Sequence, residues 1–149
     1  MADIKERAKA LNGEIVRWRR QVHQNPELGL HTPMTETFVV ERLREMGIDE
    51  IRSGVGGHGV AALVRGKKPG KVLGMRADMD ALPVKEETGL PFASTVEGRM
   101  HACGHDAHVA ILLGTARILA ENRNDLAGTV KLIFQPSEED SEGALAMIR

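Results

Sequence analysis

A long apolar segment lies between two strand-like segments in the second half of the sequence, and this order constrains the fold more than any other feature. Residues 107–121 are apolar on most sides and long enough for a helix, which predicts a buried helix packed against a sheet. Residues 71–77 read as a strand after a turn at 68–70, and the β-branched run 128–136, which ends in proline, suits a buried strand. Because helices and strands interleave, we expect an α/β domain with a layered central sheet flanked by helices.

Two helices are expected before these strands. The first has a buried stripe of apolar residues at steps of three and four, starts from a capping box at Asp3 and stops near Asn25. The stripe comprises Ile4, Ala8, Leu11, Ile15, Trp18 and Val22. We expect these residues in the core. The second helix should begin at Thr32-Pro33, with a capping threonine and proline at the first helical position, and end at Gly47.

A glycine-rich segment, residues 54–59, precedes the strand-like run 60–64. A phosphate-binding loop would need a strand before the glycines and a helix after them. Because these glycines lead into a strand, the segment predicts a turn, and His58 is interpreted as a turn residue.

The composition narrows the classes of function. The 149 residues carry a net charge of −1, and no apolar run is long enough for a membrane span, so we expect neither a nucleic-acid nor a membrane partner. The length suits one domain and the N-terminus lacks an apolar signal core, so we expect a cytoplasmic protein. The single cysteine rules out an internal disulfide, which leaves Cys103 inert, catalytic or a metal ligand.

Polar clusters follow the predicted strands or precede the buried helix, at the edge where open α/β sheets bind ligands. Asp78 and Asp80 are two residues apart in an extended segment, so their carboxylates point the same way and repel unless a cation or donor compensates. Cys103 and His105 flank Gly104, so a thiolate and an imidazole can reach one cation, or two close cations, from a single turn.

Glu138 and Glu139 form the third cluster, directly after the last predicted strand. One carboxylate could bind metal while the other stays unligated and takes the proton from the attacking water. Solvated surface acids or helix caps are the alternative interpretation of both acidic clusters.

Other interpretations of the cysteine segment stay open. His101 and His105 have the spacing of a helical zinc pair, although the glutamate of the H-E-x-x-H motif is absent. Cys103 could be the nucleophile of a thiol hydrolase. His108, beside Asp106 near the start of the buried helix, could be a core histidine or could support a metal site.

Five segments resemble, in order and spacing, the metal-dependent amidohydrolases of the aminoacylase and carboxypeptidase family: RRQVHQNPELG, RADMDALP, MHACGHDAH, GTVKLIFQPSEE and the trailing GA. The branch they resemble comprises hippurate hydrolases, N-acyl-amino-acid amidohydrolases and auxin-conjugate hydrolases. The resemblance implies a di-zinc-peptidase-like catalytic domain with two divalent metal ions (Zn, Mn, Co or Ni). It also implies a homo-oligomer that hydrolyses N-acyl amino acids to a carboxylic acid and a free amino acid.

The resemblance also assigns roles by matching motif. Cys103, His105 and Glu139 correspond to metal ligands, Glu138 to the general base and Asp80 to the aspartate that supports the site. Cys103 takes the bridging position that an aspartate fills in other members. Asp78 stands where more distant relatives have a ligand histidine, so the resemblance gives it no role.

Members of this family continue well beyond the point that matches Arg149, with a further ligand histidine, a small dimerisation and lid domain, and a last ligand histidine. We therefore expect residues 1–149 to be the N-terminal part of a catalytic domain, with an uncovered apolar sheet face that promotes self-association. Three ligands shared by two ions fill neither coordination shell, so we expect doubtful metal occupancy and weak or no turnover by this chain alone. A non-catalytic metal-binding module and a Cys103 thiol hydrolase are the rival hypotheses.

Overall fold

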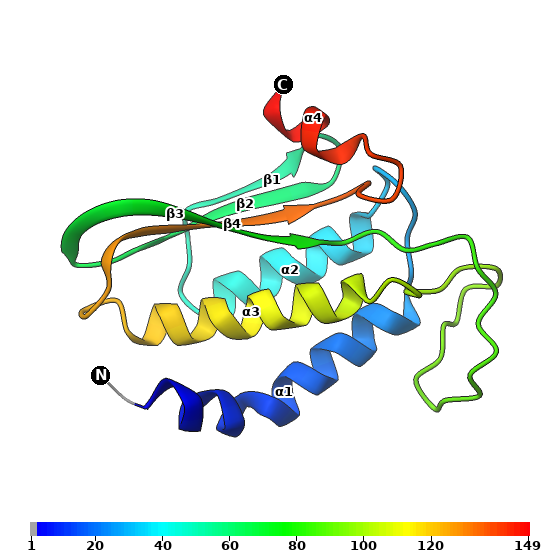
Figure 1. Cartoon of the computed structure of the whole chain (residues 1–149), viewed down its shortest axis with the longest axis horizontal. Helices are drawn as coiled ribbons and strands as arrows, with labels where there is room; N and C mark the ends of the chain where they lie inside the picture. The colour runs from blue at the N-terminus through cyan, green and yellow to red at the C-terminus, as the bar shows by residue number, and fades with distance from the viewer. Residues whose placement is uncertain (1–2) are drawn as a thin grey trace.

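A four-stranded sheet carries three long helices on one face and one short helix near the other (Figure 1). The computed structural model describes residues 3–149. The predicted layered α/β fold is confirmed. The elements are α1 (Ile4–Gln24), α2 (Pro33–Glu45), β1 (Ile51–Val55), β2 (Gly59–Arg65), β3 (Lys68–Asp78), α3 (His105–Glu121), β4 (Ala127–Gln135) and α4 (Gly143–Ile148). Within the described part of the chain, no helix combines the length and apolarity needed to cross a membrane.

The strand order β1-β2-β4-β3 brings two strands that are distant in sequence side by side. β3 and β4 are parallel, with Ala77 opposite Phe134 and Asp78 opposite Gln135, and α3 forms the connection between them. β2 is antiparallel to both β1 and β4. Because parallel strands end at the same edge of a sheet, the residues that follow β3 and β4 meet there.

The helix-covered face of the sheet is the core. Along β4, Leu132 and Phe134 are fully buried against the helices, while Lys131 and Ile133 point to the opposite face, as the two-residue period of a strand requires. Trp18 of α1 is 5% exposed and belongs to this core, as predicted.

The first turns of α1 are exposed, contrary to the sequence prediction. Leu11 is buried, but Ile4 is 52% exposed and Ala8 is exposed as well. Arg7 pairs with Glu121, the last residue of α3. Residues of α1 before this pair therefore reach past the end of the helix on which α1 packs.

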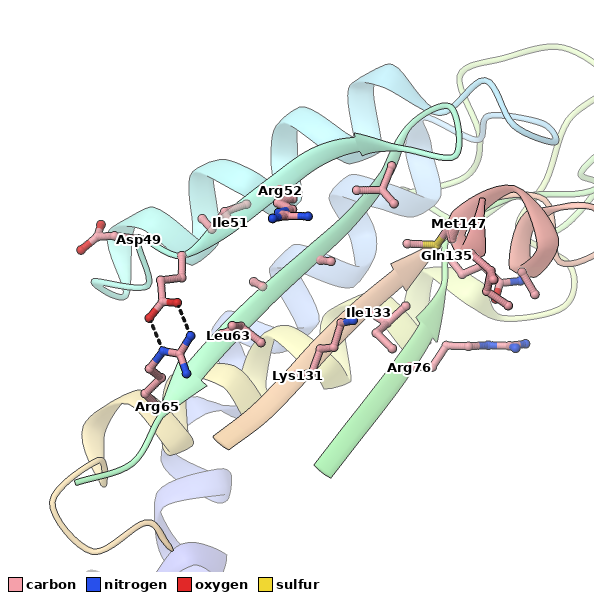
Figure 2. Close-up of a pocket in the computed structure, with 16 residues that line it drawn as sticks. Asp49, Ile51, Arg52, Leu63, Arg65, Arg76, Lys131, Ile133, Gln135 and Met147 are labelled. Carbon is pink, nitrogen blue, oxygen red and sulfur yellow. Dashed lines mark hydrogen bonds and ion pairs between the residues drawn. The ribbon is translucent and has the colours of Figure 1, made fainter. Parts of the chain in front are cut away.

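The opposite face of the sheet has little cover. A hollow of about 750 Å³ lies there, over β1, β2 and β4 and beside α4 (Figure 2). Its apolar lining includes Leu63, Ile133 and Met147, and its cations include Arg52 and Lys131. The uncovered, partly apolar sheet face expected from the sequence is therefore present.

Helix α2 begins at Pro33, as predicted, but its cap differs from the prediction. Thr32 makes no capping hydrogen bond. The carboxylate of Glu27 instead accepts the backbone N–H groups of Met34 at 3.0 Å and Thr35 at 2.8 Å. A glutamate six positions before the first residue of the helix thus accepts hydrogen bonds from free N–H groups of its first turn.

Of two turns predicted between residues 50 and 70, one is confirmed in part and the other was wrong. The turn predicted at 54–59 is confined to residues 56–58, where His58 lies as predicted, while its first and last residues belong to β1 and β2. The predicted turn at 68–70 is the start of β3, because Lys68 already pairs with Ala127. The chain instead bends at residues 66–67, where Gly66 lies too close to the carbonyl of Leu126 for any larger residue.

Candidate metal centre

Three short segments meet at the carboxyl edge of β3 and β4. The segment after β3 contains Asp80, the turn before α3 contains Cys103 and His105, and the segment after β4 contains Glu138 and Glu139. The chain thus brings all five predicted site residues to one end of the sheet, although they are up to 59 positions apart in sequence.

A left-handed glycine shapes the turn that contains the cysteine. Gly104 has φ of +83° and is the N-cap residue of α3. This conformation favours glycine, because a β-carbon would clash with the backbone. It lets Cys103 end the turn while His105 begins the helix, so the two side chains reach the same space from adjacent elements.

The imidazole of His105 is oriented by the segment after β3. Its Nδ1 lies 2.9 Å from the backbone carbonyl of Asp80, which can only accept a hydrogen bond, so Nδ1 carries a proton. Its Nε2 then faces the carboxylates, 3.7 Å from Glu138 Oε2 and 3.8 Å from Glu139 Oε1. The neighbouring Asp80 raises the pKa of His105 to about 9.

Asp80 links all three segments. Its side chain is fully buried, its Oδ2 accepts the backbone N–H of Glu139 at 3.1 Å, and its Oδ1 lies 3.4 Å from His105 Nδ1. Burial raises the pKa of Asp80, but the hydrogen bonds from His105 and from the backbone of residues 138–139 outweigh burial and lower it overall. Asp80 is therefore a charged support for the ligand segments, and its oxygens point at the protein.

Cys103, His105 and Glu139 each place one donor atom within 4.8 Å of the other two. Glu139 Oε1 is buried and has no hydrogen-bond partner among residues 3–149, which is costly unless a cation compensates. The carboxylate of Glu139, then burial, raise the pKa of the Cys103 thiol, and a divalent cation reverses this effect. The donor set of sulfur, nitrogen and oxygen fits a zinc-like divalent ion.

Asp78 and His108 lie beside this cluster, and with His105 they form a second group of closely spaced donor atoms. The carboxylate of Asp78 is already compensated, because it accepts from Arg76 Nε at 2.8 Å and lies 3.5 Å from His108 Nδ1. The two aspartates that the sequence placed on one side therefore have different surroundings, and it is Asp80 whose carboxylate accepts the backbone N–H of Glu139.

His101 lies close by and does not contribute a donor to either group. It is 3% exposed, and both ring nitrogens lack hydrogen-bond partners in the described part of the chain. Burial lowers its pKa to about 4. The helical pairing of His101 with His105 considered from the sequence does not occur, because α3 begins only at His105.

The sequence analysis did not predict the residues of α1 that contact the start of α3, next to His105. His23 and Arg19 both bind Asp106, the residue after His105. Their segment was part of the resemblance, but no spacing rule predicts a contact between residues 83 positions apart.

Comparisons with known proteins show which family the chain is similar to. Residues 74–149 match the profile of peptidase family M20/M25/M40. The chain is 48% identical over 148 residues to thermostable carboxypeptidase 2 of Saccharolobus solfataricus, covering 97% of this chain and 37% of that protein. It is 42% identical over 137 residues to N-acyl-L-amino acid amidohydrolase of Geobacillus stearothermophilus, covering 92% of this chain and 37% of that protein.

The fold also matches a solved structure from Bacillus subtilis, described as a dinuclear metal-binding peptidase of the M20 family. The TM-score is 0.89 at 44% identity, with 94% of this chain and 39% of that chain covered. The chain thus spans about 37% to 39% of the length of these relatives.

Proposed function

The chain belongs to peptidase family M20/M25/M40, and we propose that it is part of a metal-dependent amidohydrolase that cleaves N-acyl amino acids to a carboxylic acid and a free amino acid. The observation that carries the proposal is the convergence of a thiol, an imidazole and a carboxylate within 4.8 Å, beside a second glutamate. The name of the Geobacillus stearothermophilus relative supports the substrate class.

The residues of this chain that would hold metal are Cys103, His105 and Glu139. The dinuclear description of the Bacillus subtilis structure supports two ions, and the mixed donor set suits Zn, Mn, Co or Ni. When bound, such ions polarise the scissile carbonyl and acidify a water molecule.

Glu138 is the proposed general base. Its side chain is 39% exposed and its Oε2 lies 3.7 Å from His105 Nε2, so it borders the cluster and faces space that a substrate can reach. Its carboxylate takes a proton from the attacking water and returns it to the leaving amine nitrogen. Asp80 holds His105 and the backbone of Glu139 in place during this exchange.

We propose that residues 1–149 are the N-terminal part of the catalytic domain, since they span about 37% of the length of the carboxypeptidase relative. Three donors shared by two ions leave both coordination shells incomplete, so the full centre would need ligands from outside these residues. We also propose a homo-oligomer in the cytoplasm, where a reducing environment keeps the Cys103 thiol available for metal.

Metal binding by the chain itself tests the ligand assignment. Cobalt(II) coordinated by a thiolate has a charge-transfer absorption band, and Cys103 is the only thiol, so the band reports this one residue. Wild-type protein should develop the band on titration with Co²⁺, and Cys103→Ser should abolish it. Glu139→Gln should weaken binding at least tenfold, whereas Glu142→Gln, nearby but outside the cluster, should not. Equal binding by Cys103→Ser and wild type would refute the ligand assignment.

The role of Glu138 separates an enzyme from a metal-binding module. In a protein with turnover on hippurate or N-acetyl amino acids, Glu138→Gln should remove activity and leave metal content unchanged. Unchanged activity would contradict the proposed base.

The thiol hydrolase is the less favoured rival, because a nucleophilic cysteine needs a lowered pKa and the pKa of Cys103 is raised. Only the metal enzyme would recover from chelation when metal is added back.

A further inference from the structure

A buried charged cluster connects helix α1 to the candidate metal ligands. The carboxylate of Asp106, the residue that follows His105, is fully buried. Its Oδ2 lies 2.6 Å from Arg19 Nε and 2.7 Å from His23 Nδ1. Arg19 and His23 are four residues apart in α1, so both point from one face of that helix toward the start of α3.

The same histidine also holds the loop that leads into the ligand turn. His23 Nε2 lies 3.2 Å from Oε1 of Glu86, whose side chain is only 3% exposed. Glu86 in turn accepts the backbone N–H of Ser94 at 2.6 Å. His23 therefore joins two segments that converge on Cys103, the loop before it and the helix after it.

The ligand His105 is thus fixed from two sides. The sheet holds its ring through the carbonyl of Asp80, and α1 holds the next residue through Asp106. The turn between has Gly104 in the left-handed conformation, and Asp106 Oδ1 accepts the backbone N–H of Ala107 in the first turn of α3 at 2.9 Å. The buried ion pairs of Asp106 Oδ2 therefore hold the first turn of α3, and the adjacent His105, against α1.

We propose that Arg19, His23 and Asp106 are positioning residues for the metal centre: they contact no donor atom, and they fix the Cys103–His105 turn in the geometry that binds a cation. This inference rests on the proposed function. It gives a role to the RRQVHQ segment, which lies more than 70 positions before the ligands and carries no ligand itself. Outer partners of metal ligands typically change affinity by about 10-fold to 100-fold when removed.

The helix pair α1 and α3 supplies a matched control at its far end. Arg7 pairs with Glu121 through two hydrogen bonds of 2.7 Å, joining the same two helices away from the site. Asp106→Asn and Glu121→Gln each replace one carboxylate of an α1–α3 ion pair by an amide of the same shape. The Asp106 carboxylate is buried and that of Glu121 is 35% exposed, so the two changes differ in their cost to stability. A role limited to holding the helices together therefore predicts that metal affinity follows the stability of each variant.

The experiment is Co²⁺ titration of the 149-residue chain, read at the thiolate charge-transfer band, with urea unfolding of each variant. We expect Asp106→Asn and His23→Gln to weaken Co²⁺ affinity at least tenfold and to alter the band, and Glu121→Gln to change affinity less than twofold. The double variant His23→Gln/Asp106→Asn should lose less affinity than the two single losses added together, because both single changes remove the contact between His23 and Asp106. Val39→Ala, a buried change in α2, should lower stability without changing affinity.

The outcomes distinguish this inference from the proposed function. Absence of a cobalt–thiolate band in wild type would overturn the proposed metal site and this inference with it. A normal band and affinity in Asp106→Asn would overturn the positioning role alone. Equal losses of affinity in Asp106→Asn, Glu121→Gln and Val39→Ala would also overturn it, since affinity would then follow stability rather than the turn.

Discussion

The two faces of the same sheet differ in what covers them. On one face α1, α2 and α3 bury a continuous core in which Phe134 and Leu132 are completely inaccessible. On the other, only α4 lies beside a hollow of about 750 Å³ whose lining mixes Ile133 and Leu63 with charged groups (Figures 1 and 2). Neighbouring side chains of one strand are therefore expected to contribute unequally to stability, with the larger contributions from those on the covered face.

The largest expected effect is on the covered face. Phe134→Ala should cost about 3–5 kcal/mol of unfolding free energy, because it leaves a cavity in a packed core. Ile133→Ala, one position away on the open face, should cost less than about 1.5 kcal/mol, since that side chain is only partly buried. Urea unfolding of both variants measures the difference. Equal losses would mean that the open face is packed as tightly as the core.

The sequence predicted the sheet and its covering helix well where local sequence patterns determine them. The β-branched run 128–136 and the apolar run 107–121 predicted a strand of the sheet and the helix that covers it, and short motifs marked Cys103, His105 and the glutamates as candidates. These are local patterns, and the physical constraint on each lies within a few neighbouring residues. Strand β1 was missed because Gly54 and its neighbours carry turn chemistry, and its pairing with β2 is what makes it a strand.

Contacts between distant segments were not predictable in this way. Glu27 caps α2, and His23 binds Asp106, through side chains whose partners are set by the folded topology. Sequence spacing also could not separate Asp78 from Asp80, which face different partners after folding. The residues missed were therefore those that contact the candidate ligands' segments rather than the candidate ligands themselves.

The second prediction tests whether a cation bound at the candidate metal centre stabilises the folded chain. A cation that binds only the folded chain at 100 times its dissociation constant should add about 2.7 kcal/mol of unfolding free energy. The gain should vanish in Cys103→Ser and on addition of a chelator. Thermal unfolding with and without Co²⁺ or Zn²⁺ is the measurement, and an equal gain in Cys103→Ser would place the cation elsewhere.

The third prediction concerns Glu86, which lies in the loop before Cys103 and contacts His23 of α1. Burial raises the pKa of Glu86, but hydrogen bonds from Thr88, the Ser94 N–H and His23 outweigh it and lower the pKa below its ordinary value of 4.5. A carboxyl whose folded pKa is lowered contributes stability above its unfolded pKa and loses it as the pH falls through the folded pKa.

Glu86→Gln should therefore destabilise the chain at pH 7, and its difference from wild type should shrink steadily below about pH 4.5. Urea midpoints measured between pH 7 and 3.5 give this difference. Glu87→Gln, whose side chain is 78% exposed, is the neighbouring control and should show no comparable pH dependence. A difference that grows on acidification would contradict the assigned contacts of Glu86.

The smallest expected effect on stability, and the sharpest test of the open side, is at the free edge of the sheet. β3 is an edge strand, and its Val72 is 70% exposed, so its unpaired backbone is a template for a second copy. Val72→Lys should change the unfolding free energy by less than about 0.5 kcal/mol, because the side chain has few contacts to lose.

Val72→Lys should nevertheless reduce self-association, since a charge on an edge strand opposes strand pairing between molecules. Ile4→Lys, at a position 52% exposed on α1 rather than on the sheet, is the control. Sedimentation velocity over a concentration series is the measurement. If Val72→Lys and Ile4→Lys associate equally strongly, copies of the chain meet through another surface. If the wild type is a monomer at all concentrations, the open face of the sheet is stable in water without a partner.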